Sequence, residues 1–165
     1  MYVARKEADL KDLRNAAKKG EITILSSSDE ILARRVVDKF PVDLVTNLAT
    51  STGRDHTHYR RSGATQVLFN MMTDKKVAYL IDFNRILATS PGKGRALLLG
   101  RIMQNIRIAQ KAKRQVPVFI LGDRAEDMLK AFARVLGARK PLTKTDLTIW
   151  KTKKLKIIKR GVKYL

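Results

Sequence analysis

The stretch Val77-Ala-Tyr-Leu-Ile-Asp-Phe83 decides the fold class of this chain. Its nearly continuous apolar run is typical of a parallel strand that is covered on both faces. Shorter apolar runs predict further strands at residues 22–25, 42–45, 116–121 and 147–150. Helical spacing of apolar residues predicts helices at residues 6–19, 28–40, 63–73, 92–113, 123–136 and 151–165. Strands that alternate with helices through short loops indicate parallel βα units.

The length of 165 residues limits how such units can be arranged. A closed eight-stranded barrel usually needs at least about 200 residues. We therefore expect a single α/β domain over residues 1–165, with a basic C-terminal segment at residues 139–165. Its sheet is either a small open one or an incomplete piece of a barrel.

Net charge is the strongest compositional signal. The chain has 35 Lys and Arg against 15 Asp and Glu, a formal charge of +20. A compact domain with this charge attracts polyanions, of which nucleic acid is the commonest. An anionic membrane surface and a basic surface without a specific partner remain as alternatives.

Several functional classes are excluded by composition. With no cysteine, the chain has no disulfide, thiolate zinc site, iron–sulfur ligand or cysteine nucleophile. Its apolar runs are too short to cross a bilayer, and residues 1–19 show no apolar core of a signal peptide. We expect a cytoplasmic protein that does not bind membranes.

Basic residues are concentrated in the loops that should follow the strands. No acidic residue occurs between Asp82 and Asp123. Loops that follow parallel strands lie along one edge of the sheet, so residues from distant loops should converge there. We predict a surface that binds the RNA phosphate backbone and consists of Arg54, Arg60, Arg61, Arg85, Lys93, Arg95 and Arg124.

Candidate catalytic and metal-binding residues are few. His56 and His58 could join an Asp in a metal site, but no other histidine completes a ligand set and arginines surround them. Asp82 ends a strand alone, so we expect it to bind a nearby Arg or backbone amide. Asp43 should lie at the opposite end of the sheet. We therefore predict no catalytic residue and no metal site on the protein.

A set of short motifs also resembles a known family. In chain order they occupy residues 42–45, 62–63, 67–68, 77–78, 81–87, 95–96, 101–106 and 136–137. Their order and spacing resemble archaeal ribonuclease P protein component 3, which has a eukaryal relative. The resemblance covers about residues 22–140.

The resemblance implies a TIM-barrel-like α/β fold, here incomplete with about 4–6 βα units because the family has further units before them. It implies a subunit without catalytic residues that supports RNA-catalysed removal of the 5′ leader from precursor tRNA. The implied partners are ribonuclease P RNA, precursor tRNA and other protein subunits, including a small one. No cofactor is expected on the protein, and Mg²⁺ is expected on the RNA.

Two other functions remain open from the residues alone. A general structured-RNA-binding or ribosome-associated protein would have the same composition. A metal-dependent phosphoesterase would need several histidines and carboxylates that converge on a metal. The chain has only two histidines, which disfavours this second alternative.

Overall fold

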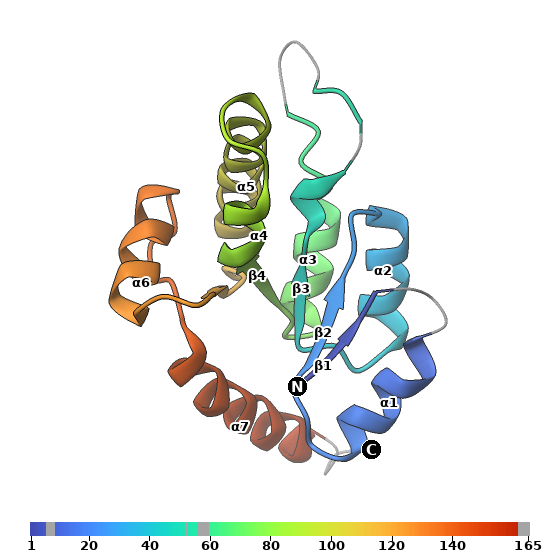
Figure 1. The fold of residues 1–165 in the computed structure, drawn as a ribbon. Coiled ribbons are helices and arrows are strands. Elements are labelled where there is room, and N and C mark those ends of the chain that lie inside the picture. The colour runs from blue at the N-terminus through green and yellow to red at the C-terminus, as the bar shows by residue number, and fades with distance from the viewer. Residues whose placement is uncertain (6–8, 52, 56–59, 162–165) are drawn as a thin grey trace.

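The sheet contains five strands, all parallel, in the order in which they occur along the chain. The computed structural model describes residues 1–5, 9–51, 53–55 and 60–161. The strands are β1 (Tyr2–Ala4), β2 (Thr23–Ser26), β3 (Leu44–Thr46), β4 (Ala78–Asp82) and β5 (Val118–Leu121) (Figure 1). Sequential order is the order of a barrel wall, whereas a doubly wound sheet reverses direction. Within the described residues β1 and β5 do not pair, so the sheet is open. The predicted parallel α/β fold is confirmed.

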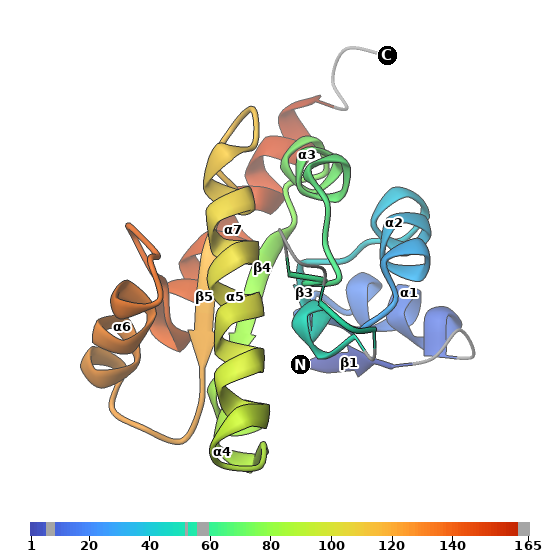
Figure 2. The same ribbon diagram turned by 90° about the horizontal axis from the view of Figure 1, so that it is seen from above.

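The helices that follow the strands, up to α6, cover one face of the sheet (Figures 1 and 2). They are α1 (Leu10–Lys18), α2 (Glu30–Lys39), α3 (Gln66–Asp74), the short α4 (Phe83–Ala88), α5 (Lys93–Lys111) and α6 (Glu126–Val135). Alternate strand residues such as Leu25, Val45 and Tyr79 enter the core that these helices cover. We call this outer side the convex face and the opposite side the concave face.

A single helix, α7 (Lys144–Gly161), packs on the concave face. Its Leu147 lies in a cluster with Ile24, Leu44 and Phe119, and Trp150 meets the ring of Phe119 edge-on at 5.7 Å. Figure 1 shows α7 crossing from the β5 side of the sheet toward β1. The helix thus covers apolar strand residues that a closed barrel would bury in its interior.

The predicted strand at residues 147–150 is wrong, because these residues belong to α7. The apolar run is too short to show its period. In the structure Leu147 and Trp150, three positions apart, face the sheet, whereas Ile149 is 54% exposed. The predicted helix at residues 151–165 is confirmed as far as Gly161, and the remaining four residues lie outside the described part.

Strand β1 and helix α4 were not predicted from the sequence. Strand β1 has only three residues and pairs Val3 with Ile24 of β2. Helix α4 begins directly after β4, where the Asp82 carboxylate accepts a hydrogen bond from the Arg85 backbone amide at 3.0 Å. The expectation that Asp82 serves a backbone amide is confirmed.

A close contact between two backbone segments fixes the position of Gly63, shortly before α3. Gly63 has a positive φ of 70°, and a Cβ at this position would lie 1.9 Å from the carbonyl oxygen of Leu48. Leu48 begins the short helix η2 (Leu48–Thr50) after β3. Only glycine allows the backbone to pass η2 at this distance.

In the described part of the chain, no helix combines the length and the apolar character that a bilayer crossing requires.

Candidate nucleic-acid interface

The carboxyl ends of the strands carry polar side chains on the concave face. Ser26 pairs in register with Thr46, and Thr46 with Leu80, so these three side chains form one row across β2, β3 and β4. Asn47 donates a hydrogen bond from Nδ2 to Ser26 Oγ at 2.8 Å. This row and Leu147 of α7 line a cavity of about 1020 Å³. We call this cavity the concave cleft.

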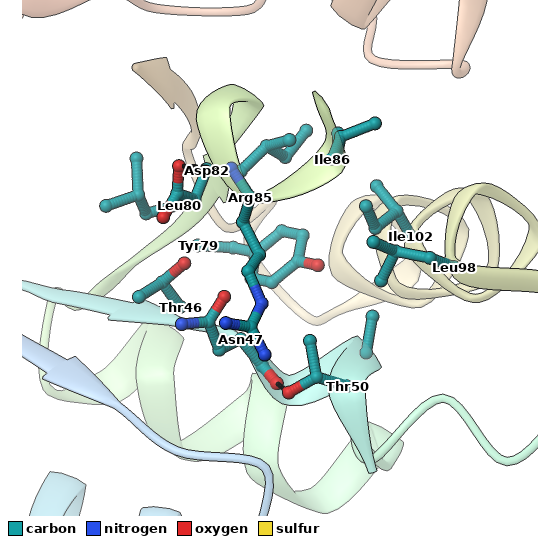
Figure 3. A pocket seen from close by; sticks show the side chains of 12 residues that line it. Thr46, Asn47, Thr50, Tyr79, Leu80, Asp82, Arg85, Ile86, Leu98 and Ile102 are labelled. Carbon is teal, nitrogen blue, oxygen red and sulfur yellow. Dashed lines mark hydrogen bonds between the residues drawn. The ribbon is translucent and has the colours of Figure 1, made fainter. Parts of the chain in front are cut away.

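Two of the predicted RNA-binding residues meet at the concave cleft. Arg85 extends from α4 over Asn47 and Thr50 (Figure 3), and Arg124 follows β5 on the same cavity. Both side chains are exposed. The structure therefore brings these two predicted residues, from loops after different strands, to one cavity.

Arg101 anchors the long loop at residues 51–61. Its side chain is 5% exposed and donates a hydrogen bond to Asp55 Oδ1 at 2.8 Å and to the carbonyl oxygen of Ser51 at 2.5 Å. It also donates to the carbonyl oxygen of Gly53. One guanidinium from α5 therefore satisfies three acceptors of the loop and fixes it against the helix.

The predicted residues Arg54, Arg60 and Arg61 are exposed in this loop. The Arg60 backbone amide donates to Gln104 Oε1 at 3.1 Å, and its side chain passes over Gly100. The described part of the loop therefore stands beside α5 (Figure 1), away from the residues that line the concave cleft. His56 and His58 lie outside the described residues.

Arg95 and Lys93 lie at a third place, where α4 turns into α5. Arg95 is partly buried and donates from Nη2 to the carbonyl oxygens of Leu87 and Thr89 at 2.9 and 3.0 Å. It thereby satisfies backbone acceptors at the end of α4. Lys93 begins α5 and is exposed. The predicted residues therefore fall into three separate basic regions and not into one continuous surface.

Electrostatics keep the Asp55 carboxylate ionised. Partial burial raises its pKa, but hydrogen bonds from Arg101 and from the Arg61 backbone amide lower it. The nearby charges of Arg101 and Arg60 also lower it, so the pKa lies below its ordinary value. Opposite charges and donors at short distance have this effect. Asp55 is therefore part of the loop anchor and partly offsets the positive charge of Arg60, 3.8 Å away.

Metal-ligand clusters are absent from the part of the chain that the structure describes. The carboxylates nearest to the concave cleft already accept hydrogen bonds inside the protein. Asp82 binds the Arg85 amide, and Asp123 Oδ2 accepts from Asn84 Nδ2 at 2.8 Å. Asp43 lies at the opposite end of the strands, as expected, where it accepts from the Thr23 amide at 3.0 Å.

Sequence reasoning missed the anchoring role of Arg101. A signal was present, since Arg101 and Asn105 are four residues apart and fall among the apolar positions Leu98, Ile102 and Ile106 of one helix face. Asn105 is fully buried and donates to the Ser62 carbonyl oxygen at 2.9 Å.

No family model matches this chain, and no curated protein matches it. Chains in solved structures do match it. The fold is similar to a chain in the cryo-EM structure of archaeal ribonuclease P with mature tRNA, with a TM-score of 0.63 and 22% sequence identity. The similarity covers 96% of this chain and 64% of that chain, so this chain spans less than two thirds of the protein it matches. At this identity the likeness establishes the fold.

Proposed function

We propose that this protein is an RNA-binding subunit of ribonuclease P, of the protein component 3 type, that supports removal of the 5′ leader from precursor tRNA. The observation that carries the proposal is the fold similarity over 96% of the chain to a chain of archaeal ribonuclease P with mature tRNA. The order of sequence motifs points independently to the same ribonucleoprotein.

The distribution of charge supports RNA as the partner. The chain carries a net charge of +20, and Arg54, Arg60 and Arg61 are exposed on a loop that Arg101 holds in place. Arginine binds phosphate through two parallel hydrogen bonds, so a fixed loop of arginines can orient an RNA backbone. The proposed mechanism is neutralisation and positioning of RNA, with Mg²⁺ held by the RNA.

Charge replacement explains how such a subunit would assist catalysis. Ribonuclease P RNA and precursor tRNA repel each other, and high Mg²⁺ can screen this repulsion. Positive side chains at fixed positions lower the same repulsion at low Mg²⁺. The protein therefore acts on assembly of the two RNAs and supplies no acid, base or nucleophile to the cleaved bond.

The experiment is a reconstitution with the cognate RNA and the other subunits. Added protein should raise the rate of precursor tRNA cleavage at low Mg²⁺, whereas the protein without RNA should not cleave. Cleavage by RNA-free protein would overturn the proposal and favour a phosphoesterase.

A matched pair of variants separates specific positioning from bulk charge. Arg60→Gln/Arg61→Gln removes two charges from the anchored loop and should lower assisted cleavage strongly. Lys11→Gln/Lys18→Gln removes two exposed charges from α1 and should leave cleavage near the parent rate. Equal losses in the two variants would indicate a general structured-RNA-binding protein, as would copurification of mainly other RNAs from native cells.

A further inference from the structure

The concave cleft carries a buried hydroxyl group that the protein does not use. Thr46 is 5% exposed, and its Oγ1 has no hydrogen-bond partner. The side chain lies between Ser26 and Leu80 in the row across β2 to β4 and lines the cleft. An unsatisfied buried hydroxyl destabilises a fold, so a group in the cleft that hydrogen-bonds to Thr46 would be stabilising.

The charged groups around the cleft differ in whether they already have partners. The carboxylates of Asp82 and Asp123 accept the hydrogen bonds described above. Glu126 accepts from Thr143 Oγ1 at 2.6 Å and from the Thr145 amide at 3.1 Å, and these bonds lower its pKa. These acidic groups therefore already accept hydrogen bonds within the protein, and these bonds hold α4, the loop after β5 and α7 in place.

Two arginines that line the cleft have no such partners. The side chains of Arg85 and Arg124 form no hydrogen bond or ion pair with any residue that the structure describes. Figure 3 shows the Arg85 guanidinium beside the Asn47 side chain and close to Thr50. Available donors at this edge are therefore arginine N–H and hydroxyl groups, which suit an anion.

The remaining walls of the cleft are apolar. Ile22, Ile24, Leu80, Leu121 and Leu147 line it. The volume of about 1020 Å³ lies at the upper end of the range typical of small-molecule sites. A bare phosphate would leave these walls in contact with water, whereas a molecule with both an anionic group and a flat apolar part would cover them.

We propose that the concave cleft binds one nucleoside phosphate unit. Its phosphate lies between Arg85 and Arg124, its hydroxyl or base edge meets Thr46 and Asn47, and its base covers the apolar wall. This unit is an unpaired nucleotide of an RNA chain or a free nucleotide. Only the choice of RNA as the source rests on the proposed function.

Calorimetric titration of the full chain tests the proposal with three ligands: adenosine 5′-monophosphate, inorganic phosphate, and a single-stranded RNA pentamer with a 5′ phosphate. Adenosine 5′-monophosphate should bind at least tenfold more tightly than inorganic phosphate, because only the nucleotide covers the apolar wall. If the pentamer binds more tightly still, the source is RNA; if it does not, the source is a free nucleotide. Absence of nucleotide binding, or equal affinity for phosphate, overturns the proposal.

Two variants and a matched control locate the site. Arg85→Met should weaken nucleotide binding about tenfold or more, as expected for loss of a charge-assisted hydrogen bond. Arg107→Met removes the same charge from the exposed surface of α5 and should leave nucleotide affinity unchanged. Equal effects of the two changes would overturn the cleft as the site.

Thr46→Val distinguishes a ligand contact from a structural role. Valine has the same shape and lacks the unused hydroxyl, so the melting temperature of the free protein should stay equal or rise. Nucleotide affinity should fall several-fold. A lower melting temperature with unchanged affinity would assign Thr46 to the fold and overturn the contact.

The outcomes also separate this inference from the proposed function. If the nucleotide does not bind while assisted cleavage persists, the cleft is not the site and the ribonuclease P role stands. If the nucleotide binds in the cleft but precursor tRNA cleavage is not assisted, the cleft assignment stands and the ribonuclease P role falls.

Discussion

The guanidinium of Arg101 lies 2.8 Å from the carboxylate of Asp55, although 46 positions separate the two residues in sequence. Their side chains are 5% and 20% exposed. The pair fixes the loop that carries Arg54, Arg60 and Arg61 against α5. The geometry of the exposed arginines therefore depends on a buried one.

Arg101→Met should lower the free energy of unfolding by about 3 kcal/mol, because the Asp55 carboxylate and two loop carbonyls lose their donor. Urea denaturation measures this change. Arg107→Met, on the exposed side of the same helix, should change stability by less than about 0.5 kcal/mol. Similar losses in both variants would contradict the anchor.

Acid should weaken the same anchor. The pKa of Asp55 lies below its ordinary value of 3.8, so the folded state favours the ionised carboxylate. This contribution is fully present above about pH 4 and is lost as the pH falls through the lower pKa of the folded state. Asp55→Asn should therefore be less stable than the parent at pH 7, and the difference should shrink below pH 4. A difference that stays constant across this range would remove the electrostatic explanation.

Gly63→Ala should destabilise the fold by about 2–5 kcal/mol. The new Cβ would meet the Leu48 carbonyl oxygen, a backbone atom that cannot rotate away, and φ is positive. Gly20→Ala provides the control, since φ is 77° there and no atom lies within 4 Å of the added Cβ. Its cost should be only about 1–2 kcal/mol. Thermal unfolding of the two variants gives the comparison.

The buried pair of Lys151 and Asp43 should hold α7 on the concave face. Lys151 Nζ contacts the Asp43 carboxylate and donates to the Glu21 carbonyl oxygen at 3.0 Å. Lys151→Met should cost about 3 kcal/mol, because a buried carboxylate loses its counter-charge. Asp43→Asn/Lys151→Met should recover part of this loss. Additive single and double effects in denaturation would show that the pair is not coupled.

RNA binding should depend steeply on salt. If six or more phosphates are neutralised, affinity should fall by about 10³-fold or more between about 50 and 200 mM salt. Arg60→Gln/Arg61→Gln should make the slope of log affinity against log salt shallower, by the amount expected for the loss of about two phosphate contacts. Filter binding at several salt concentrations measures both quantities. Affinity that does not change with salt would exclude a phosphate-binding surface.

The sequence predicted the elements whose pattern is local. Strand β4 is visible because its residues are apolar on both faces, and helix α5 because its apolar residues repeat over many turns. Helix α7 was partly misread, since Leu147 and Trp150 face the sheet only after the chain has returned to the concave face. There Lys151 of α7 contacts Asp43, 108 positions earlier in the chain.

Only part of the candidate site was predicted, because the other part also depends on contacts between residues far apart in the sequence. The rule that loops after parallel strands share an edge was enough to bring Arg85 and Arg124 together. It could not reveal that Arg101 is buried or that Arg95 binds backbone carbonyls of α4. It also gave no weight to Thr46, because a single threonine in a strand is ordinary until its hydroxyl is found without a partner.

The position of α7 has a consequence for synthesis on the ribosome. Each strand pairs with the one made just before it, so the βα units can dock in the order in which they emerge. The concave layer of Ile24, Leu44 and Ala78 is covered by a helix that follows all five strands, and Lys151 closes a contact across 108 positions. The nascent chain therefore passes through a state with a formed sheet and an uncovered apolar face. That state is the one most open to chaperone binding and to aggregation.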